Sequence, residues 1–376
     1  MAARRLQSRK YGMIQSGAKR TDNGTGAVRI ASIGTANPPV KVDQKQADRL
    51  YSRYYKNELT QRSMDVLHKV LAHPSIQSRY ASVKSQVELL QFKNEDPDKR
   101  MDRYTYWAVE LATKAIAGAV EKCGLHPVDI DALVTNTCTG YLCPGIGTYL
   151  IESLGLSPDT FVYDLAGSGC GGAVPNIQLS SNFVAANPGK VAVSASIEIC
   201  SATYQMDNDI ALIISNAIFG DGAAAAVIWD RPRGFMLIDT MSRFDPQYRE
   251  DVRYVYKKGQ LHNRISPRLP KVLGELVPPL IKELIAKNGL KTADISHWAI
   301  HPGGDKIVEI LKEEMSLSEE QLAPTRSVLS EFGNMSSPTV LFEFDRIMNN
   351  GTVPGQWCVM VGFGAGLSIY AYLMKI

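Results

Sequence analysis

The sequence predicts an α/β fold built from two similar halves. From about residue 130 onward, short apolar segments typical of buried strands alternate with segments typical of amphipathic helices. Each half also contains a glycine-containing loop that opens a predicted helix, followed further along the chain by a glycine-rich approach to an apolar strand. The alternation favours sheets covered by helices, and the recurrence favours an internal duplication.

The predicted strands and helices follow one another in a regular order. Residues 100–125 carry apolar side chains at three- and four-residue spacing and end at a glycine, which predicts an amphipathic helix. This helix belongs to a region, 41–125, that we expect to be mainly helical. Strands are expected over 28–34, 131–137, 161–167, 190–196 and 223–230, and further helices over 148–156 and 209–219.

The two halves correspond loop by loop. AGSGCGGAVPNIQL (166–179) in the first half matches EFGNMSSPTVLF (331–342) in the second. FGDGAAAAVI (219–228) and GFGAGLSIYAYL (362–373) match in the same way. If the two copies meet face to face, both sets of loops reach a shared centre.

Three regions follow from this division. Residues 1–27 form an arm rich in Arg and Lys that lacks the apolar stretch of a secretory signal, so we expect it to be flexible. An organelle transit peptide is the alternative interpretation of the arm. Residues 28–232 form the first half and residues 233–376 the second.

Composition argues against several classes of protein. The net charge of +3 is too small to indicate a nucleic-acid partner. No apolar run reaches the roughly 18 residues that a membrane span requires. The six cysteines show no pairing rhythm, which favours a reducing compartment, and we expect a cytoplasmic protein. No Cys/His cluster has the spacing of zinc ligands, so no metal is expected.

Cys170 is the candidate nucleophile. It stands in Gly-Ser-Gly-Cys-Gly-Gly, between a predicted strand and a predicted helix. Small neighbours allow a sharp turn and let a substrate approach the sulfur. The positive end of a helix stabilises a thiolate, which is the nucleophilic form. A small buried cysteine packed in a glycine loop is the alternative interpretation.

Two polar residues of the second half border glycine-containing loops. His301 follows an apolar strand and precedes a Pro-Gly-Gly turn, where its ring can point into a cleft; a structural histidine is the alternative. Asn334 precedes a predicted helix, where Asn is also a common N-cap. Together with Cys170 their chemistry is complementary. A protonated His301 would stabilise the thiolate, and His301 and Asn334 would both donate to the oxygen of a malonyl-derived enolate.

These segments also resemble a known family. The runs AGSGCGGAVPN, NAIFGDGAAAAVI, WAIHPGGDKI, LSEFGNMSSPTVLF and VGFGAGLS are similar to those of the chalcone synthase-like, or type III, polyketide synthases, especially microbial ones. The resemblance is colinear from about Ser32 to the C-terminus. It implies a thiolase fold of five layers in the order αβαβα, a homodimer, and a coenzyme A tunnel leading to an internal cavity. The roles of nucleophile, oxyanion-binding residue and decarboxylation-assisting residue fall on Cys170, His301 and Asn334.

The implied activity is iterative decarboxylative condensation of malonyl-CoA onto an acyl-CoA starter, followed by cyclisation to pyrone or resorcinol-type products. Acyl-CoA and malonyl-CoA are the small-molecule partners, with no cofactor, nucleic acid or membrane expected. Two alternatives stay open. A ketoacyl synthase III-like enzyme that uses acyl carrier protein would share the three polar residues, and a non-catalytic thiolase-fold scaffold subunit belongs to another class.

The resemblance also implies roles for residues around the cavity. Phe219 matches the aromatic gatekeeper between tunnel and cavity, with core packing as the alternative. Cys143 matches a loop that crosses the dimer interface. Lys69 and His73 fall near the family's cationic contacts to coenzyme A, with exposed helix charge as the alternative. The remaining substrate-binding positions are Cys138, Thr139, Glu198, Cys200, Thr203, Gly303, Gly304 and Ala365.

Two departures from the family pattern bear on the product rather than on the reaction. Ala365 replaces the proline of the family's closing motif. A second gatekeeper phenylalanine has no clear counterpart, and the segment 259–274 offers Asn263 or Arg264 instead. These differences argue against a chalcone-type aromatic starter and cyclisation.

Overall fold

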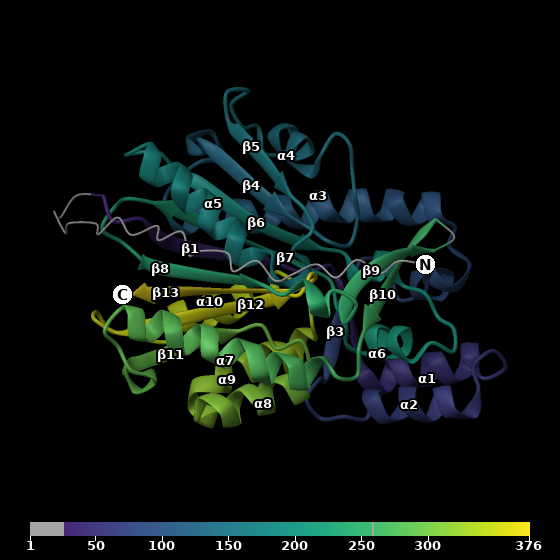
Figure 1. Cartoon of the computed structure of the whole chain (residues 1–376). Coiled ribbons are helices and arrows are strands. Elements are labelled where there is room, and N and C mark those ends of the chain that lie inside the picture. The colour runs from purple at the N-terminus through teal and green to yellow at the C-terminus, as the bar shows by residue number, and fades with distance from the viewer. Residues whose placement is uncertain (1–25, 258) are drawn as a thin grey trace, which may run out of the picture.

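The computed structural model describes residues 26–257 and 259–376, so the predicted arm lies outside the described residues except for Gly26 and Ala27. Most of the strands form one mixed sheet of nine, in the order β11-β12-β13-β8-β1-β7-β6-β4-β5 (Figure 1). Its strands are β1 (Arg29–Ala36), β4 (Ala132–Asn136), β5 (Phe161–Leu165), β6 (Ala192–Glu198), β7 (Gly222–Trp229), β8 (Phe235–Phe244), β11 (Ile295–Ile300), β12 (Trp357–Gly364) and β13 (Ser368–Lys375).

The central strands are buried on both faces. Every residue of β6 and β7 is buried, which explains why they read as continuous apolar runs rather than alternating ones. The two halves of the sheet meet where β1 pairs with β7 along its length and with β8 at its start. The predicted boundary between residues 232 and 233 lies in the turn from β7 to β8.

The helices complete the layers. Helices α5 and α10 lie between the halves of the sheet, since α5 contacts β4 and β6 as well as β12 and β13, and α10 contacts β1 as well as β11. Helices α3 and α4 cover the outer side of the first half, and α7 packs against β8 and β13 with α8 beside it (Figure 1). This order confirms the predicted α/β thiolase fold of layers αβαβα. The helices are α3 (Pro97–Lys122), α4 (Ile146–Leu154), α5 (Ala173–Ala186), α7 (Leu269–Lys287), α8 (Asp305–Met315), α9 (Glu319–Phe332) and α10 (Thr339–Asn349).

A smaller lobe lies beside one end of the sheet (Figure 1). It contains helices α1, α2 and α6, which share one apolar cluster, and two short hairpin-like sheets. The region 41–125 is mainly helical, as predicted, but it includes β3, which pairs with β2 and is too short to show a period in the sequence. The lobe's elements are α1 (Gln44–Tyr55), α2 (Gln61–Leu71), α6 (Ile210–Ile218), β2 (Val40–Asp43), β3 (Ser78–Ala81), β9 (Val252–Lys257) and β10 (Gln260–Ile265).

Short 3-10 helices connect several of these elements. They are η1 (Glu88–Asn94), η2 (Pro127–Asp129), η3 (Gly169–Gly171), η4 (Cys200–Thr203), η5 (Pro246–Tyr248) and η6 (Thr292–Asp294). Within the described ranges, no helix is long and apolar enough to cross a lipid bilayer.

Candidate active site

The two sets of loops meet at one cavity. Cys170 lies in η3, just before α5, and Asn334 lies in the loop between α9 and α10. His301 follows the last residue of β11. All three line a cavity of about 730 Å³, together with the predicted residues Cys138, Phe219, Gly303, Gly304 and Ala365. The face-to-face arrangement of the halves therefore brings Cys170 of one half to His301 and Asn334 of the other.

The backbone around Cys170 is tightly packed. The end of β12 lies against this loop, because a Cβ atom on Gly364 would be 2.2 Å from the Ser168 carbonyl oxygen and 3.0 Å from the Cys170 nitrogen. Gly169 has φ of 55°, in the left-handed region that favours glycine. Glycine at positions 169 and 364 allows the η3 turn, which contains Cys170, and the end of β12 to pack against each other.

Ser336 is a site residue that the sequence analysis missed. Its hydroxyl donates to the Cys170 Sγ at 3.2 Å and lies 3.4 Å from the Cys138 Sγ. Its backbone φ is 60°, a costly conformation for a residue other than glycine. The residue stands in the Gly-Asn-Met-Ser-Ser run, but the direction of its side chain depends on this turn and is not visible in the sequence.

Glu198 holds one wall of the cavity from behind. It is fully buried and accepts hydrogen bonds from the Cys138 nitrogen at 3.0 Å and the Thr139 hydroxyl at 2.8 Å. The Ser337 hydroxyl donates to its other oxygen at 2.9 Å, and the Ser336 hydroxyl oxygen lies 3.3 Å from that oxygen. Burial raises its pKa, while these hydrogen bonds lower it. Thr139 and Glu198 are therefore placed behind Cys138, and do not line the cavity themselves.

His301 is about 99% buried and Asn334 about 98%. The Asn334 amide nitrogen donates to the Gly303 carbonyl at 3.0 Å, and its oxygen accepts from the Ser336 nitrogen at 2.7 Å. The N-cap of α10 is Pro338, so Asn334 is not the helix cap that was the alternative interpretation. The His301 ring packs edge-on against Phe363, and its Nδ1 is buried without a hydrogen-bond partner.

Burial dominates the titration of both reactive groups. It raises the pKa of the Cys170 thiol to about 12, with the Ser336 hydrogen bond lowering it and the Glu198 charge raising it. Burial alone lowers the pKa of His301 to about 3. These shifts favour a neutral thiol and a neutral imidazole, and no hydrogen bond joins the two side chains. The thiolate–imidazolium pair inferred from the sequence stays a prediction.

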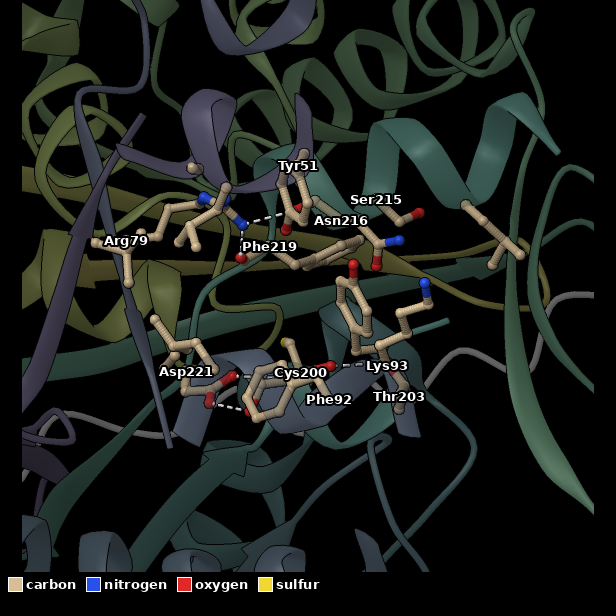
Figure 2. Close-up of a pocket in the computed structure, with 18 of the residues that line it drawn as sticks. Tyr51, Arg79, Phe92, Lys93, Cys200, Thr203, Ser215, Asn216, Phe219 and Asp221 are labelled. Carbon is tan, nitrogen blue, oxygen red and sulfur yellow. Dashed lines mark hydrogen bonds between the residues drawn. The ribbon is translucent and has the colours of Figure 1, made fainter. Parts of the chain in front are cut away.

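A second, narrower chamber of about 110 Å³ adjoins the catalytic cavity. The two share Phe219 and Asn263 in their linings. Cys200 and Thr203, predicted to bind substrate, line this chamber and not the catalytic cavity (Figure 2). Its walls are rich in aromatic rings: Tyr51, Tyr54, Tyr55, Tyr80, Phe92, Tyr204 and Phe219.

The charged side chains of this chamber are already paired within the protein. The Arg79 guanidinium donates to the carbonyls of Asn216 and Phe219 at 2.6 and 2.8 Å (Figure 2). The Asp221 carboxylate accepts from Ser201 and from the Ser82 nitrogen. Lys93 pairs with Glu58, and the Tyr204 hydroxyl donates to that of Tyr55 at 3.1 Å. The chamber therefore presents mainly ring faces and hydrocarbon to its interior.

The remaining predicted residues lie at the surface. Lys69 is exposed on α2, next to Val70, which lines the catalytic cavity. The His73 ring lies 3.9 Å from the Asp305 carboxylate, and Asp305 and Lys306 also line that cavity. Cys143 is exposed in the loop between β4 and α4, outside both cavities.

Comparison with known proteins identifies the family. Residues 36–236 match the family model of FAE1/type III polyketide synthase-like proteins, and residues 237–376 match the C-terminal domain of chalcone and stilbene synthases. The chain is 30% identical over 286 residues to the 3,5-dihydroxyphenylacetyl-CoA synthase of Streptomyces toyocaensis, which covers 73% of each chain. It belongs to the type III polyketide synthase family.

Other type III polyketide synthases agree with this assignment. The alpha-pyrone synthesis polyketide synthase-like Pks18 of Mycobacterium tuberculosis is 27% identical over 344 residues, covering 89% of this chain and 84% of the relative. The crystal structure of PKS-I from the brown alga Ectocarpus siliculosus has a TM-score of 0.86 at 26% identity, covering 94% of this chain and all of that one.

The fold of the 1,3,6,8-tetrahydroxynaphthalene synthase of Streptomyces coelicolor A3(2) is also similar, with a TM-score of 0.85 at 24% identity over 92% of this chain and 99% of that one. The family prediction is confirmed. The chain is thus an acyltransferase of the polyketide synthase type, which argues against the scaffold interpretation and favours the polyketide branch over a ketoacyl synthase III.

Proposed function

We propose that Cys170 carries the acyl chain and that His301 and Asn334 stabilise the enolate that extends it. The observation that supports this most directly is the convergence of all three side chains on one buried cavity from opposite halves of the fold. A nucleophile, a titratable ring and a neutral amide donor are the groups that thioester exchange and decarboxylation require.

The reaction begins with acylation of Cys170. The thiol proton passes to the His301 imidazole as the sulfur attacks the starter thioester, and coenzyme A leaves as its thiol. This transfer removes the cost of holding a buried thiolate, because the charge forms only as the new carbon–sulfur bond forms. The Ser336 hydroxyl, 3.2 Å from the sulfur, stabilises the developing negative charge.

Extension follows in the same cavity. Malonyl-CoA loses carbon dioxide, and the Asn334 amide and His301 ring donate to the thioester oxygen of the resulting enolate. The enolate carbon attacks the acyl carbonyl, the bond to Cys170 Sγ breaks, and the lengthened chain is left on coenzyme A. That thioester then re-acylates Cys170 for the next round. Side chains supply every proton transfer and charge contact, so the proposal includes no metal or other cofactor.

Coenzyme A would enter beside Val70 of α2 and Lys306 of α8, where the catalytic cavity borders the smaller lobe. The Lys306 ammonium is suited to a phosphate group. Lys69 and His73 remain candidates for the same role at this edge, with His73 partly engaged by Asp305.

The side chamber supports a hydrocarbon starter. Its charged groups are paired, so a polar starter would displace hydrogen bonds already made, whereas an alkyl or aryl tail would fill the space between the rings. The relatives are named for different products, an alpha-pyrone and 3,5-dihydroxyphenylacetyl-CoA. We propose that this chain extends an apolar acyl-CoA and cyclises the product to a pyrone or resorcinol.

A homodimer in the cytoplasm completes the proposal. Strand β5 forms an edge of the sheet and exposes the apolar side chains of Phe161 and Tyr163 by 58% and 40%. A bare apolar sheet edge favours pairing with another copy. Cys143 lies in the loop that follows the neighbouring strand β4, and we place it at this interface.

Intact-mass measurement tests the assignment of Cys170. The wild-type chain and Cys170→Ala are mixed with acyl-CoAs of several lengths, with and without malonyl-CoA. We expect an acyl adduct on the wild type only, release of free coenzyme A, and extractable pyrones or resorcinols once malonyl-CoA is present. No adduct across the whole series would overturn the proposal, and an adduct only from acyl carrier protein would favour the ketoacyl synthase alternative.

A chamber-filling variant tests the starter class. Ala47, buried to 97% in the chamber wall, is replaced by Phe. We expect kcat/KM for a twelve-carbon (~C12) starter to fall on the order of tenfold relative to a short one, since the tail loses its space. Ala286→Phe, at an exposed position of α7, is the matched control. An equal loss for short and long starters would contradict a tail-binding role.

A further inference from the structure

The β9–β10 hairpin places two polar side chains over the catalytic cavity, neither of which the mechanism above uses. Tyr254 and Asn263 are directly opposite each other in the antiparallel pairing of these strands. Residues paired in this way point to the same face of the hairpin. Both line the catalytic cavity, and Asn263 also lines the side chamber.

Neither side chain forms a hydrogen bond with another described residue. Asn263 as a whole residue is 9% exposed, and its side chain lines both cavities where they adjoin. The charged side chains Arg79 and Asp221 of the adjoining side chamber, in contrast, form hydrogen bonds within the protein. An unpaired buried amide is costly unless a ligand pairs with it.

The Tyr254 side chain lines the same cavity as Cys170. Burial raises its pKa well above the ordinary value, and the charges that act on it in addition are those of Cys138, Cys200, Cys170 and Glu198. The phenol is therefore protonated at neutral pH and can donate a hydrogen bond. An amide nitrogen and a phenol hydroxyl thus face the space next to the acyl-bearing cysteine.

The growing chain presents matching acceptors. A poly-β-keto chain carries a ketone oxygen on every second carbon, whereas its starter tail is hydrocarbon. Burial of these oxygens without donors would be unfavourable. Tyr254 lines the catalytic cavity, and Asn263 lines both this cavity and the side chamber. A chain with its tail in the side chamber would place the boundary between its keto part and its tail beside Asn263.

Resting on the proposed function, we propose that Tyr254 and Asn263 donate hydrogen bonds to ketone oxygens of the elongating chain and so determine its length and cyclisation. With the oxygens held at two fixed points, the tail is directed past Asn263 into the side chamber and the chain folds in one register. The pair acts as a specificity determinant and takes no part in breaking or forming the thioester bond.

Conservative substitutions test this pair. Tyr254→Phe removes only the hydroxyl, and Asn263→Leu removes the amide at similar size. Each variant receives one apolar acyl-CoA that loads the wild type, plus malonyl-CoA, and three quantities are measured: acyl-Cys170 by intact mass, free coenzyme A, and the product profile by liquid chromatography and mass spectrometry. Tyr256→Phe, on the same strand but 71% exposed and outside both cavities, is the matched control.

We expect the ratio of the main product to shorter, prematurely released products to fall about three- to tenfold in each variant, as loss of one neutral hydrogen bond predicts. Acyl-Cys170 should still form in both, and the control should keep the wild-type ratio. A wild-type ratio in both variants, with acyl-Cys170 formed, would overturn the inference alone. Absence of acyl-Cys170 in the wild type would instead overturn the proposed function, and this inference with it.

Discussion

The Cys170 thiol has one hydrogen bond from a side chain, the Ser336 hydroxyl at 3.2 Å. Burial raises the thiol pKa to about 12, and the hydroxyl opposes that rise. A thiol held in this way is protonated at neutral pH, and under the proposed mechanism it reacts when a substrate thioester and a proton acceptor are both in position. Burial lowers the pKa of His301 to about 3, so its ring is neutral at rest and is a weak proton acceptor before substrate binds.

The pH dependence of alkylation tests this state of the thiol. Because its pKa is raised, the thiolate fraction should increase about tenfold per pH unit between about pH 6 and about pH 9, and the rate of reaction with iodoacetamide should follow. Ser336→Ala should slow alkylation about three- to tenfold at a given pH by raising the pKa further. A plateau at neutral pH that disappears in His301→Gln would instead reveal a resting thiolate–imidazolium pair.

At the scale of elements, the approach of the β12 end to the η3 turn fixes the nucleophile. Gly364 has no room for a side chain, since its Cβ would lie 2.2 Å from the Ser168 carbonyl oxygen. The atoms that this Cβ would meet are backbone atoms of Ser168, Gly171 and Cys170. They cannot move aside without displacing Cys170. Glycine at position 364 is thus a packing requirement of the cysteine loop.

Gly364→Ala should therefore reduce the rate of Cys170 acylation on the order of 100-fold, the cost of misplacing a reacting group by about 1 Å. Rapid-quench intact mass measures this rate. Gly118→Ala is the control, because a Cβ there meets nothing within 4 Å and the helix α3 should gain about 0.5–1 kcal/mol. Equal acylation rates in the two variants would show that the loop tolerates displacement.

Helix α10 carries a buried acid that makes stability depend on pH. Glu343 is fully buried and accepts a hydrogen bond from the Thr325 hydroxyl at 2.9 Å. Burial raises its pKa well above the ordinary value of 4.5. The folded state therefore keeps the proton that the unfolded chain loses, so this contribution to stability is present below about pH 4.5 and decreases as the pH rises above it.

Glu343→Gln should remove this pH dependence, because the amide has the same shape and does not ionise. Urea unfolding of both proteins at about pH 5 and about pH 8 measures it, and we expect the wild type to lose more stability across this interval than the variant. Glu121→Gln, at an exposed position of α3, should behave like the wild type. Parallel loss in wild type and Glu343→Gln would contradict the raised pKa.

At the scale of the whole molecule, β5 forms an edge of the nine-stranded sheet and exposes apolar side chains. Among the described strands, β5 pairs with β4 alone. The centroid of the Phe161 ring lies 5.5 Å from that of Phe183, and Phe161 is 58% exposed. Apolar surface of this kind at a sheet edge is unfavourable in an isolated chain. The proposed homodimer would cover it.

Light scattering after size exclusion tests the dimer. The wild type should have twice the chain mass of 41.3 kDa, and Phe161→Lys should weaken association by at least about 30-fold, as loss of an aromatic interface anchor does. Val353→Lys, exposed by 56% in the loop before β12, is the control. A monomeric wild type at micromolar concentration would rule out the proposed assembly.

Local patterns in the sequence predicted a large part of this protein. Continuous apolar runs identified β6 and β7, and the Gly-Ser-Gly-Cys and Gly-Asn loops identified the neighbourhoods of Cys170 and Asn334. Strand and helix periods, and the need for glycine where the chain turns sharply or packs closely, act within a few residues. In the second half, the Pro-Gly-Gly turn after His301 predicted that its ring points into a cleft, and His301 lines the cavity.

Only the tertiary structure decided what surrounds those residues. In the structure, Cys200 and Thr203 line a separate chamber, and Thr139 and Glu198 lie behind the cavity wall. Ser336, which the sequence analysis did not name, contacts the Cys170 sulfur. The tertiary structure also pairs Tyr254 with Asn263 at the cavity that Cys170 lines, on two strands that the sequence did not indicate. Cavities, buried hydrogen bonds and shifted pKa values arise where segments far apart in the chain pack together, so their residues carry no shared local pattern.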